Sequence, residues 1–276
     1  MKYLFVCVHP DDLEFNCGNI IADLSKRGAE THILSLTQGE FGIFEDRWKG
    51  RKLAKIRVNE LIRAATINGV PKERVHFGNI PDGFVRFSEE HLKYVIEILN
   101  GIQPDIVFAC EPYFTIYWHT DHINCGRLLY YIVTNQNNEK LPTPIEHPIK
   151  ALYLYTSLKP DFVWPFSDPT NAYKALYQHK SQWWVLKWNK IFYPIEKRCG
   201  WSWKRKIGKW KYIEKFRRVL PDKPLPKEDL KSKLLIRLIY RFKIINPSES
   251  HYKVLKDTDP QYYEYIESLR AKYGFK

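Results

Sequence analysis

The sequence has no apolar run long enough to cross a membrane and no closely spaced pair of cysteines. A spanning helix needs about 20 consecutive apolar residues, and the runs here are much shorter. The five cysteines are scattered and never form a CxxC pair, which argues against both a disulfide framework and a cysteine zinc knuckle. The first apolar run meets His9 and Asp11 and not a small-residue cleavage site, so we expect no signal peptide. These absences favour a cytoplasmic protein.

Acidic residues are scarce between residues 183 and 243, which hold 19 Lys or Arg and 5 Asp or Glu. Six of the nine tryptophans lie there too. Because the whole chain carries a formal charge of +13, the remainder is close to neutral. We therefore predict a catalytic α/β domain over residues 1–182. Residues 183–276 form a basic, aromatic C-terminal extension that packs on this domain or contacts a partner or a membrane.

Short apolar stretches alternate with amphipathic ones through the first part of the chain. This alternation predicts an α/β fold with a mostly parallel sheet and helices on both faces. Ser88, followed by two glutamates, is predicted to cap a helix. The predicted strands are 3–8, 31–37, 74–77, 105–110 and 151–155, and the predicted helices are 17–28, 48–69, 89–100, 121–133 and 171–182.

Two clusters of chemically active residues follow predicted strands. His9, Asp11 and Asp12 come directly after the first strand, and His119 and His122 follow the fourth. Open α/β sheets bind ligands at the carboxyl ends of their strands. Strongly hydrated side chains at such an edge indicate a site for a cation or a substrate.

If both clusters lie at the same edge, His9, Asp12 and His122 can hold one metal ion. Three nitrogen and oxygen ligands, with a fourth position left to water, describe a catalytic zinc site. Two histidines and one carboxylate also suit non-haem iron. The additional Asp11 and His119 are better explained by hydrolysis of an amide or an ester.

The remaining polar residues of the two clusters have separate predicted roles. Zinc lowers the pKa of its bound water to about 7, and Asp11, directed away from Asp12 in the turn, can act on this water as general base. His119 would stabilise the oxyanion or donate a proton to the leaving amine. Asp121 could orient His119, and Tyr117 could add a hydrogen bond to the oxyanion.

Each of these features also has an ordinary structural explanation. A single histidine is more often a core or surface residue, and an Asp-Asp pair after proline is commonly a turn. An HxxH spacing by itself is weak evidence for a metal. The joint pattern is much less common by chance, and it carries the prediction.

Six motifs give the sequence a resemblance to the LmbE-like, or PIG-L, deacetylase family. The resemblance implies a Rossmann-like fold and zinc-dependent removal of acetyl from an N-acetylglucosamine unit. It also implies that His9, Asp12 and His122 hold zinc, that Asp11 is the base, and that His119 with Tyr117 stabilises the tetrahedral intermediate. The motifs are HPDD-x-E (9–14), T-x-GE-x-G (37–42), R-x-x-E (57–60), PDG (81–83), Y-x-H-x-D-H (117–122) and HKSQ (179–182).

The resemblance further implies substrate contacts for Arg57 and Asp82, and less firmly for Glu40. A helix-surface ion pair and a β-turn aspartate are the alternative explanations for Arg57 and Asp82. Glu14 and Gln182 match family positions to which we assign a supporting role.

The sequence departs from the family pattern at three places. Asn19 stands where a second glycine is usual, and Thr120 stands where a proline is common. Neither change removes a group that the chemistry needs. In the last third of the chain no family motif is recognisable, so the sequence leaves the group attached to the aminosugar open.

The extension contains an amphipathic stretch, residues 229–245, with one apolar stripe and interleaved Lys and Arg. We favour packing of this stripe on the sheet or on a second copy of the chain in a homo-oligomer. The alternative is an interfacial helix on an anionic membrane surface. Basic and aromatic residues together also occur in nucleic-acid-binding proteins, but no recognised nucleic-acid motif is present.

We therefore predict a cytoplasmic, zinc-dependent N-deacetylase, in contact with a membrane surface if the extension binds one. Its substrate would be an N-acetylglucosaminyl conjugate. The alternatives are an amidase that cleaves a larger acyl group from an aminosugar, and a metal-bearing glycan-binding protein without turnover.

Overall fold

A seven-stranded sheet forms the centre of the computed structural model, which describes residues 1–115, 119–184, 186–187, 197, 212–221, 234 and 252–274. The strand order is β3-β2-β1-β4-β5-β7-β6. The strands are β1 (Lys2–Cys7), β2 (Glu30–Ser35), β3 (Val75–Phe77), β4 (Ile106–Cys110), β5 (Ala151–Tyr155), β6 (Phe162–Phe166) and β7 (Tyr212–Val219).

Strands β1 to β5 are parallel to one another. The strand order reverses at β1, because β2 and β3 lie on one side of it and β4 and β5 lie on the other. Phe5 of β1 lies opposite Ile33 of β2 on one side and Phe108 of β4 on the other. Strand β3 extends the sheet beyond β2, and β5 extends it beyond β4. Ligands of open α/β sheets bind where the strand order reverses. The carboxyl ends of β1 and β4 are therefore the expected place for a site.

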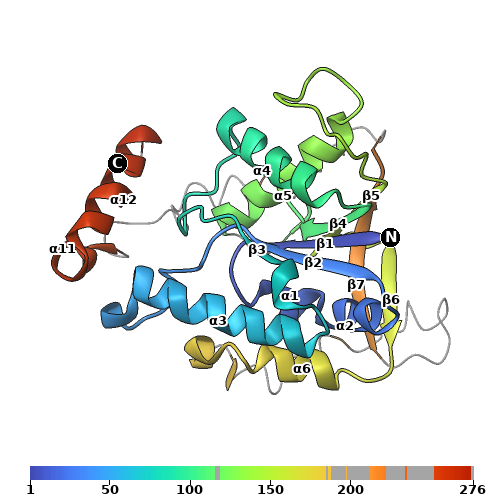
Figure 1. Cartoon of the computed structure of the whole chain (residues 1–276), viewed down its shortest axis with the longest axis horizontal. Coiled ribbons are helices and arrows are strands. Elements are labelled where there is room, and N and C mark those ends of the chain that lie inside the picture. Colours follow the sequence, from blue (N-terminus) through green and yellow to red (C-terminus); the bar gives the residue numbers. More distant parts are fainter. Residues whose placement is uncertain are drawn as a thin grey trace.

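Helices cover both faces of the sheet, as predicted (Figure 1). Helices α4 and α5 pack together on one face, and α6 packs against α1, α2 and α3 on the other. The Ser88 side chain accepts a hydrogen bond from the backbone N–H of His91, which confirms the predicted cap. The helices are α1 (Asp12–Asn16), α2 (Gly18–Lys26), α3 (Arg51–Ile67), α4 (Glu89–Ile102), α5 (Thr120–Asn135), α6 (Thr170–Leu176), α11 (Leu255–Thr258) and α12 (Pro260–Lys272), with 3-10 turns at Asp46–Trp48, Lys72–Arg74 and Lys180–Gln182.

The core lies along both faces of the central strands. The side chains from Leu4 to Val8 are fully buried, because helices cover β1 on both sides. The rings of Phe5 and Phe108 stack with their centroids 4.4 Å apart. An unbroken apolar run is what a parallel strand buried on both faces requires, and it is the pattern that identified β1 in the sequence. The α/β fold with a mostly parallel sheet is confirmed.

Two strands at one side of the sheet were not expected. Strand β7 pairs antiparallel with β5 and with β6. Its side chains at Glu214 and Arg217 are mostly buried, where Glu214 accepts hydrogen bonds from the backbone N–H groups of Asn19 and Ile20 at 2.9 Å. These buried charges interrupt the apolar alternation that would have identified the strand.

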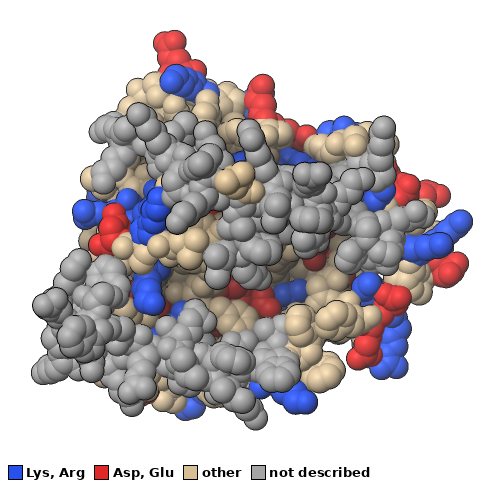
Figure 2. Space-filling model, turned by 180° about the vertical axis from the view of Figure 1, so that it is seen from behind, with Lys and Arg blue, Asp and Glu red and all other residues tan. Residues whose placement is uncertain are grey.

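Residues beyond Gln182 thus contribute to the same sheet as the residues before it, through β7. The division of the chain after Gln182 stays a prediction. The amphipathic stretch 229–245 lies almost wholly outside the described residues. Among the residues that the structure describes, we find no helix both long and apolar enough to span a membrane. On the face shown in Figure 2, described basic and acidic side chains are interspersed.

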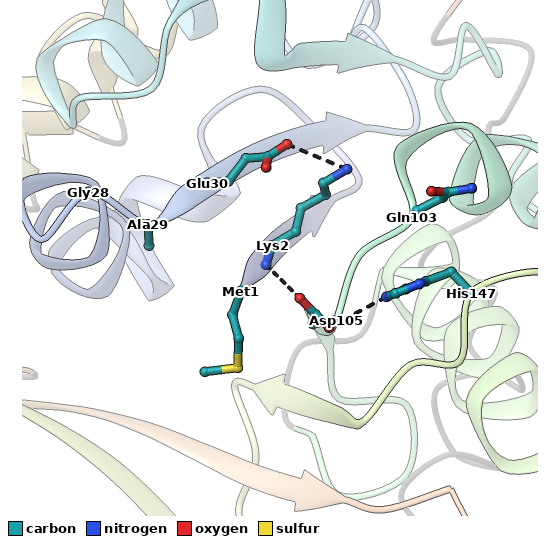
Figure 3. Close-up of a pocket in the computed structure, with 8 residues that line it drawn as sticks. All are labelled: Met1, Lys2, Gly28, Ala29, Glu30, Gln103, Asp105 and His147. Atoms are coloured by element: carbon teal, nitrogen blue, oxygen red, sulfur yellow. Dashed lines mark hydrogen bonds and ion pairs between the residues drawn. The ribbon is translucent and has the colours of Figure 1, made fainter.

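The amino-terminal edge of the sheet holds a cavity of about 460 Å³ (Figure 3). Lys2, which lines it, contacts both of its carboxylates: the Lys2 backbone N–H donates to Asp105 Oδ2 at 2.8 Å, and Lys2 Nζ lies 3.4 Å from Glu30 Oε1. His147 Nε2 lies 3.4 Å from Asp105 Oδ1. The two carboxylates that line this cavity therefore already have partners.

Candidate functional site

The two predicted clusters lie together at the carboxyl-terminal edge of the sheet. His9 follows β1 and Asp12 begins α1, while His119 caps the N-terminus of α5 and His122 lies in its first turn. The rings of His9 and His122 have their centroids 5.0 Å apart. Because β1 and β4 are neighbours, residues more than a hundred positions apart in the sequence meet in one place.

His9, Asp12 and His122 form a group in which the potential ligand atoms all lie within 4.8 Å of one another. All three residues are at least nine-tenths buried. Asp12 Oδ2 lies 3.0 Å from His122 Nε2 and accepts a hydrogen bond from the backbone N–H of His9 at 2.9 Å. Burial acts to raise the pKa of Asp12, but His122 and His9 hold it well below its usual range. The carboxylate is therefore ionised, as a metal ligand must be.

This donor set fits a divalent metal ion. Imidazole nitrogens and a carboxylate oxygen are the ligands of catalytic zinc sites that leave a position open. A second group, His9, His119 and Asp121, meets the same distance limit of 4.8 Å. His9 belongs to both groups and so lies at the centre of the candidate site.

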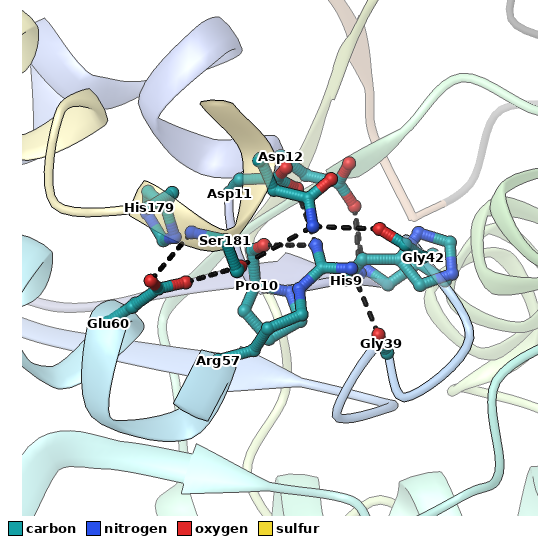
Figure 4. A network of polar contacts seen from close by, with 12 residues as sticks. His9, Pro10, Asp11, Asp12, Gly39, Gly42, Arg57, Glu60, His179 and Ser181 are labelled. Carbon is teal, nitrogen blue, oxygen red and sulfur yellow. Dashed lines mark hydrogen bonds and ion pairs between the residues drawn. The ribbon is translucent and has the colours of Figure 1, made fainter. Parts of the chain in front are cut away.

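Asp11 faces a different partner from Asp12. Its Oδ1 lies 3.2 Å from Arg57 Nη2, as Figure 4 shows beside the Asp12 side chain. The Asp11 backbone has φ of 126°, a conformation that a residue with a side chain rarely adopts and that clusters at functional sites. Burial raises the pKa of Asp11 to about 6, against the opposing effect of Arg57. The neighbouring aspartates thus have separate environments.

Arg57, predicted to contact substrate, is only 3% exposed. Its guanidinium donates to the carbonyl oxygens of Pro10 at 2.6 Å and Gly39 at 3.0 Å (Figure 4). These contacts join the turn after β1 to the loop after β2. In this structure Arg57 binds both of these segments and the Asp11 carboxylate. Contact between Arg57 and substrate stays a prediction.

The side chains of Glu40 and Asp82 each accept a hydrogen bond from the backbone of the loop that carries the other. Glu40 Oε1 accepts the backbone N–H of Asp82 at 2.9 Å, and Asp82 Oδ2 accepts the backbone N–H of Phe41 at 3.2 Å. Asp82 Oδ1 also lies 2.8 Å from His9 Nε2. Burial opposes protonation of His9, but Asp82 raises the pKa of His9 to about 9. Burial raises the pKa of Glu40 to about 7. Both acids thus shape the site, whether or not they touch substrate.

His119 is held by the backbone at the start of α5. Its Nδ1 accepts the backbone N–H of Asp121 at 3.3 Å, so in the neutral ring the proton is on Nε2. Burial lowers the pKa of His119 to about 3. The Asp121 carboxylate accepts the backbone N–H of Gly83 at 2.6 Å, and burial raises its pKa to about 7. Asp121 orients His119 through its backbone; orientation through its carboxylate stays a prediction.

The HKSQ motif packs behind this site. Gln182 Nε2 donates to the Gly42 carbonyl oxygen at 2.8 Å, and the backbone N–H of Ser181 donates to Glu60 at 2.8 Å. His179 Nε2 lies 3.0 Å from Glu14 Oε2, and both side chains are fully buried. The sequence contained both motifs, but no local pattern reveals that His179 and Glu14 pair across the fold. Tyr117 lies outside the described residues.

Comparison with known proteins gives one family model and several relatives. The model described as "PIG-L: GlcNAc-PI de-N-acetylase" matches residues 4–133, which include His9 and His122. The diacetylchitobiose deacetylase of Thermococcus kodakarensis is 29% identical over 188 residues, which are 66% of this chain and 70% of that protein. The 1D-myo-inositol 2-acetamido-2-deoxy-alpha-D-glucopyranoside deacetylase of Corynebacterium diphtheriae is 26% identical over 49% of this chain and 53% of its own length. The chain thus spans about half of the second relative.

Two solved structures share the fold at similar identity. The N,N'-diacetylchitobiose deacetylase from Pyrococcus horikoshii superimposes with a TM-score of 0.72 at 27% identity, covering 83% of this chain and 88% of that one. The protein TT1542 from Thermus thermophilus superimposes with a TM-score of 0.67 at 26% identity, covering 83% and 99%. The similarity extends well beyond the residues that the family model matches.

Proposed function

Because the chain belongs to the LmbE-like, or PIG-L, family, we propose that it is a hydrolase that removes the N-acetyl group from an N-acetylglucosaminyl conjugate with the help of zinc. The proposal rests on one observation. His9, Asp12 and His122 lie together, and the neighbouring Asp11 contacts Arg57 instead of this group. The sequence relatives named above are deacetylases of N-acetylated aminosugars, and this supports the same reaction class.

His9, Asp12 and His122 are the residues that would hold the metal. A bound zinc ion would supply a Lewis acid and lower the pKa of a water molecule to about 7. Asp12 stays ionised for this task because His122 Nε2 lies 3.0 Å from its Oδ2. The backbone N–H groups of Val8 and His9, both bound to the same oxygen, fix the direction of the carboxylate.

Asp11 is the proposed general base. With a pKa of about 6, raised by burial, its carboxylate is mostly ionised at neutral pH and still basic enough to take a proton from the attacking water. Arg57 Nη2 lies 3.2 Å from Asp11 Oδ1. This contact fixes the carboxylate and leaves its other oxygen to accept the proton. The same group can return this proton to the nitrogen of the departing amine.

His119 is the proposed donor to the oxygen of the scissile amide. The Asp121 backbone N–H occupies its Nδ1, so the neutral ring offers Nε2–H to charge that develops on the carbonyl oxygen. A donor fixed before the reaction stabilises such charge without reorganisation. Tyr117 is proposed to add a second hydrogen bond, and Asp82, Glu40 and Arg57 to contact or enclose the sugar.

Contact with an anionic membrane surface through residues 183–245 remains part of the proposal. Its support is the excess of Lys and Arg and the six tryptophans in this region. Co-sedimentation with anionic and with neutral liposomes tests it. Salt-sensitive binding to the anionic liposomes alone is expected, and no binding at physiological salt would leave the region a structural one.

The experiment for the reaction is a screen of acetate release. The purified chain, loaded with zinc, is offered N-acetylglucosamine, diacetylchitobiose, and nucleotide-linked and lipid-linked N-acetylglucosamine. We expect acetate release from at least one of them, lost on chelation and regained with metal. Release of a longer acyl group only would make the chain an amidase, and ligand binding without any release would make it a glycan-binding protein.

A further inference from the structure

Residues 252–274, which we call the terminal segment, contact the candidate site from outside the part of the chain that the family model matches. The segment contains α11 and α12. In Figure 1 both helices lie on the side of the sheet away from the marked N-terminus, which is the side toward which β1 runs. This is the edge at which His9 follows β1.

One end of the terminal segment is attached to the start of α3. Asp259 accepts two hydrogen bonds from the Arg51 guanidinium, at 2.6 and 2.7 Å, and also caps α12 by accepting the backbone N–H of Tyr262. Leu255, 1% exposed, packs so closely on Gly50 that a Cβ at Gly50 would lie 2.6 Å from its Cδ2. The loop between β2 and α3 is therefore held from one side by this segment.

The other end contacts the loop after β3 and the first turn of α4, which follows that loop. Lys272 Nζ pairs with Glu90 at 2.8 Å, and the Arg86 guanidinium lies 5.7 Å from the ring centre of Tyr273. The segment thus connects the two loops that carry Glu40 and Asp82. These are the loops that already bind each other through those two side chains.

Between the two attachments, a chain of hydrogen bonds leads from α12 into the site. The Tyr262 hydroxyl donates to Glu40 Oε1 at 2.8 Å. The same oxygen accepts the backbone N–H of Asp82 at 2.9 Å, and Asp82 Oδ1 lies 2.8 Å from His9 Nε2. Burial and the neighbouring Glu40 raise the pKa of Tyr262, so the phenol keeps the proton that it donates.

We propose that Tyr262 is a positioning residue for this reaction: through Glu40 it fixes Asp82, and through Asp82 the ring of His9. The proposal rests on the proposed function for its catalytic consequence, but its structural part stands on the contacts alone. Glu40 Oε2 is buried and has no hydrogen-bond partner among the described residues. Tyr262 supplies the side-chain donor that orients the Glu40 carboxylate, beside the backbone donor of Asp82 at the same oxygen.

The test compares Tyr262→Phe with Tyr265→Phe. Both changes remove one phenolic hydroxyl from α12, but Tyr265 is 46% exposed. The full chain is loaded with Co²⁺, whose visible absorption reports the geometry of its ligands. We expect Tyr262→Phe to keep one metal per chain, to change the Co²⁺ spectrum and to weaken Co²⁺ binding by up to about 10-fold. Removal of a ligand's direct hydrogen-bond partner costs about 10- to 100-fold, and Tyr262 acts on that partner through Glu40. Tyr265→Phe is expected to match the wild type.

Acetate release gives the catalytic part of the test. We expect Tyr262→Phe to lower kcat by about 10-fold, with a smaller change in KM, because the substituted residue orients the site and need not touch substrate. A merely structural residue would lower thermal stability and leave the Co²⁺ spectrum unchanged. Equal Co²⁺ spectra, affinities and kcat for the two variants would overturn the proposal.

A double-mutant cycle tests the route through Glu40. In a Glu40→Gln background, Tyr262→Phe is expected to have little further effect on Co²⁺ affinity, because the two side chains act as one unit. Additive effects would overturn this route. If the wild type releases no acetate while the Co²⁺ results hold, the proposed function fails and the positioning role stands. If the wild type releases acetate but the Co²⁺ spectra and affinities of the two variants are equal, the positioning role fails and the proposed function stands.

Discussion

At the amino-terminal edge of the sheet Asp105 pairs with Lys150, whose side chain is 64% exposed, whereas at the carboxyl-terminal edge Asp11 and Asp12 lie inside the protein. The contact with Lys150 and the Lys2 backbone N–H hold the pKa of Asp105 well below its usual range. Burial raises the pKa of Asp11 to about 6. Asp105, which precedes β4, and Asp11, which follows β1, thus differ in which protonation state their surroundings favour. Asp12 is ionised like Asp105, but the groups that hold it so are the buried His122 and His9.

The comparison shows that residue type alone does not distinguish a site from a surface ion pair. Water screens a charge pair at the exposed edge, so its contribution is small. In the interior the effective dielectric constant is lower, and each neighbour has a larger effect on the charge beside it. The carboxyl-terminal edge is therefore the one at which substitutions should change chemistry as well as stability.

The largest effect is expected for Asp12→Ala. This change removes the carboxylate that lies beside both His9 and His122, so the protein should lose its metal and its acetate release together. Metal content of the purified variant, measured by atomic emission, checks the first loss. Full metal occupancy in this variant would exclude Asp12 as a ligand.

Asp11→Asn should separate catalysis from metal binding. Asparagine keeps the shape of the side chain but cannot accept the proton, so kcat should fall by about 10²- to 10⁴-fold while the metal content stays at the wild-type level. Steady-state acetate release and metal analysis on the same sample measure both quantities. Unchanged turnover would remove Asp11 from the role of base.

His179→Gln should reduce stability by breaking a pair behind the site. His179 and Glu14 are both fully buried and lie 3.0 Å apart. Removal of one partner leaves the other buried and uncompensated, so the free energy of unfolding should fall by about 3–5 kcal/mol. Urea denaturation measures this change. Adding Glu14→Gln should recover part of the loss, and a double variant as unstable as the sum of the single variants would contradict the pairing.

Glu30→Gln at the opposite edge should have the smallest effect. The Glu30 side chain is 44% exposed and lies 3.4 Å from Lys2 Nζ. Screening by water limits such a pair to about 1 kcal/mol or less, and acetate release should not change. The same denaturation and activity assays apply. An effect as large as that of His179→Gln would mean that the two edges do not differ in the way described.

The sequence predicts the central strands and the first residues of the site because both depend on local patterns. An apolar run that stops at His9 marks the end of a buried strand, and the three-residue spacing of His119 and His122 keeps both at the start of a predicted helix. The contacts of His179 and Tyr262 have no such signal. Each of these side chains meets its partner through the fold of the whole chain, more than 100 residues away.

The contact between Asp12 and His122 links residues 110 positions apart in the sequence. These two proposed ligands meet only after β1 and β4 have paired, so binding of a metal ion by them would be linked to folding of this part of the sheet. An ion present at 100 times its dissociation constant would stabilise the folded chain by about 2.7 kcal/mol. The availability of metal during synthesis would then influence how much of the protein survives in the cell, in addition to how fast it works.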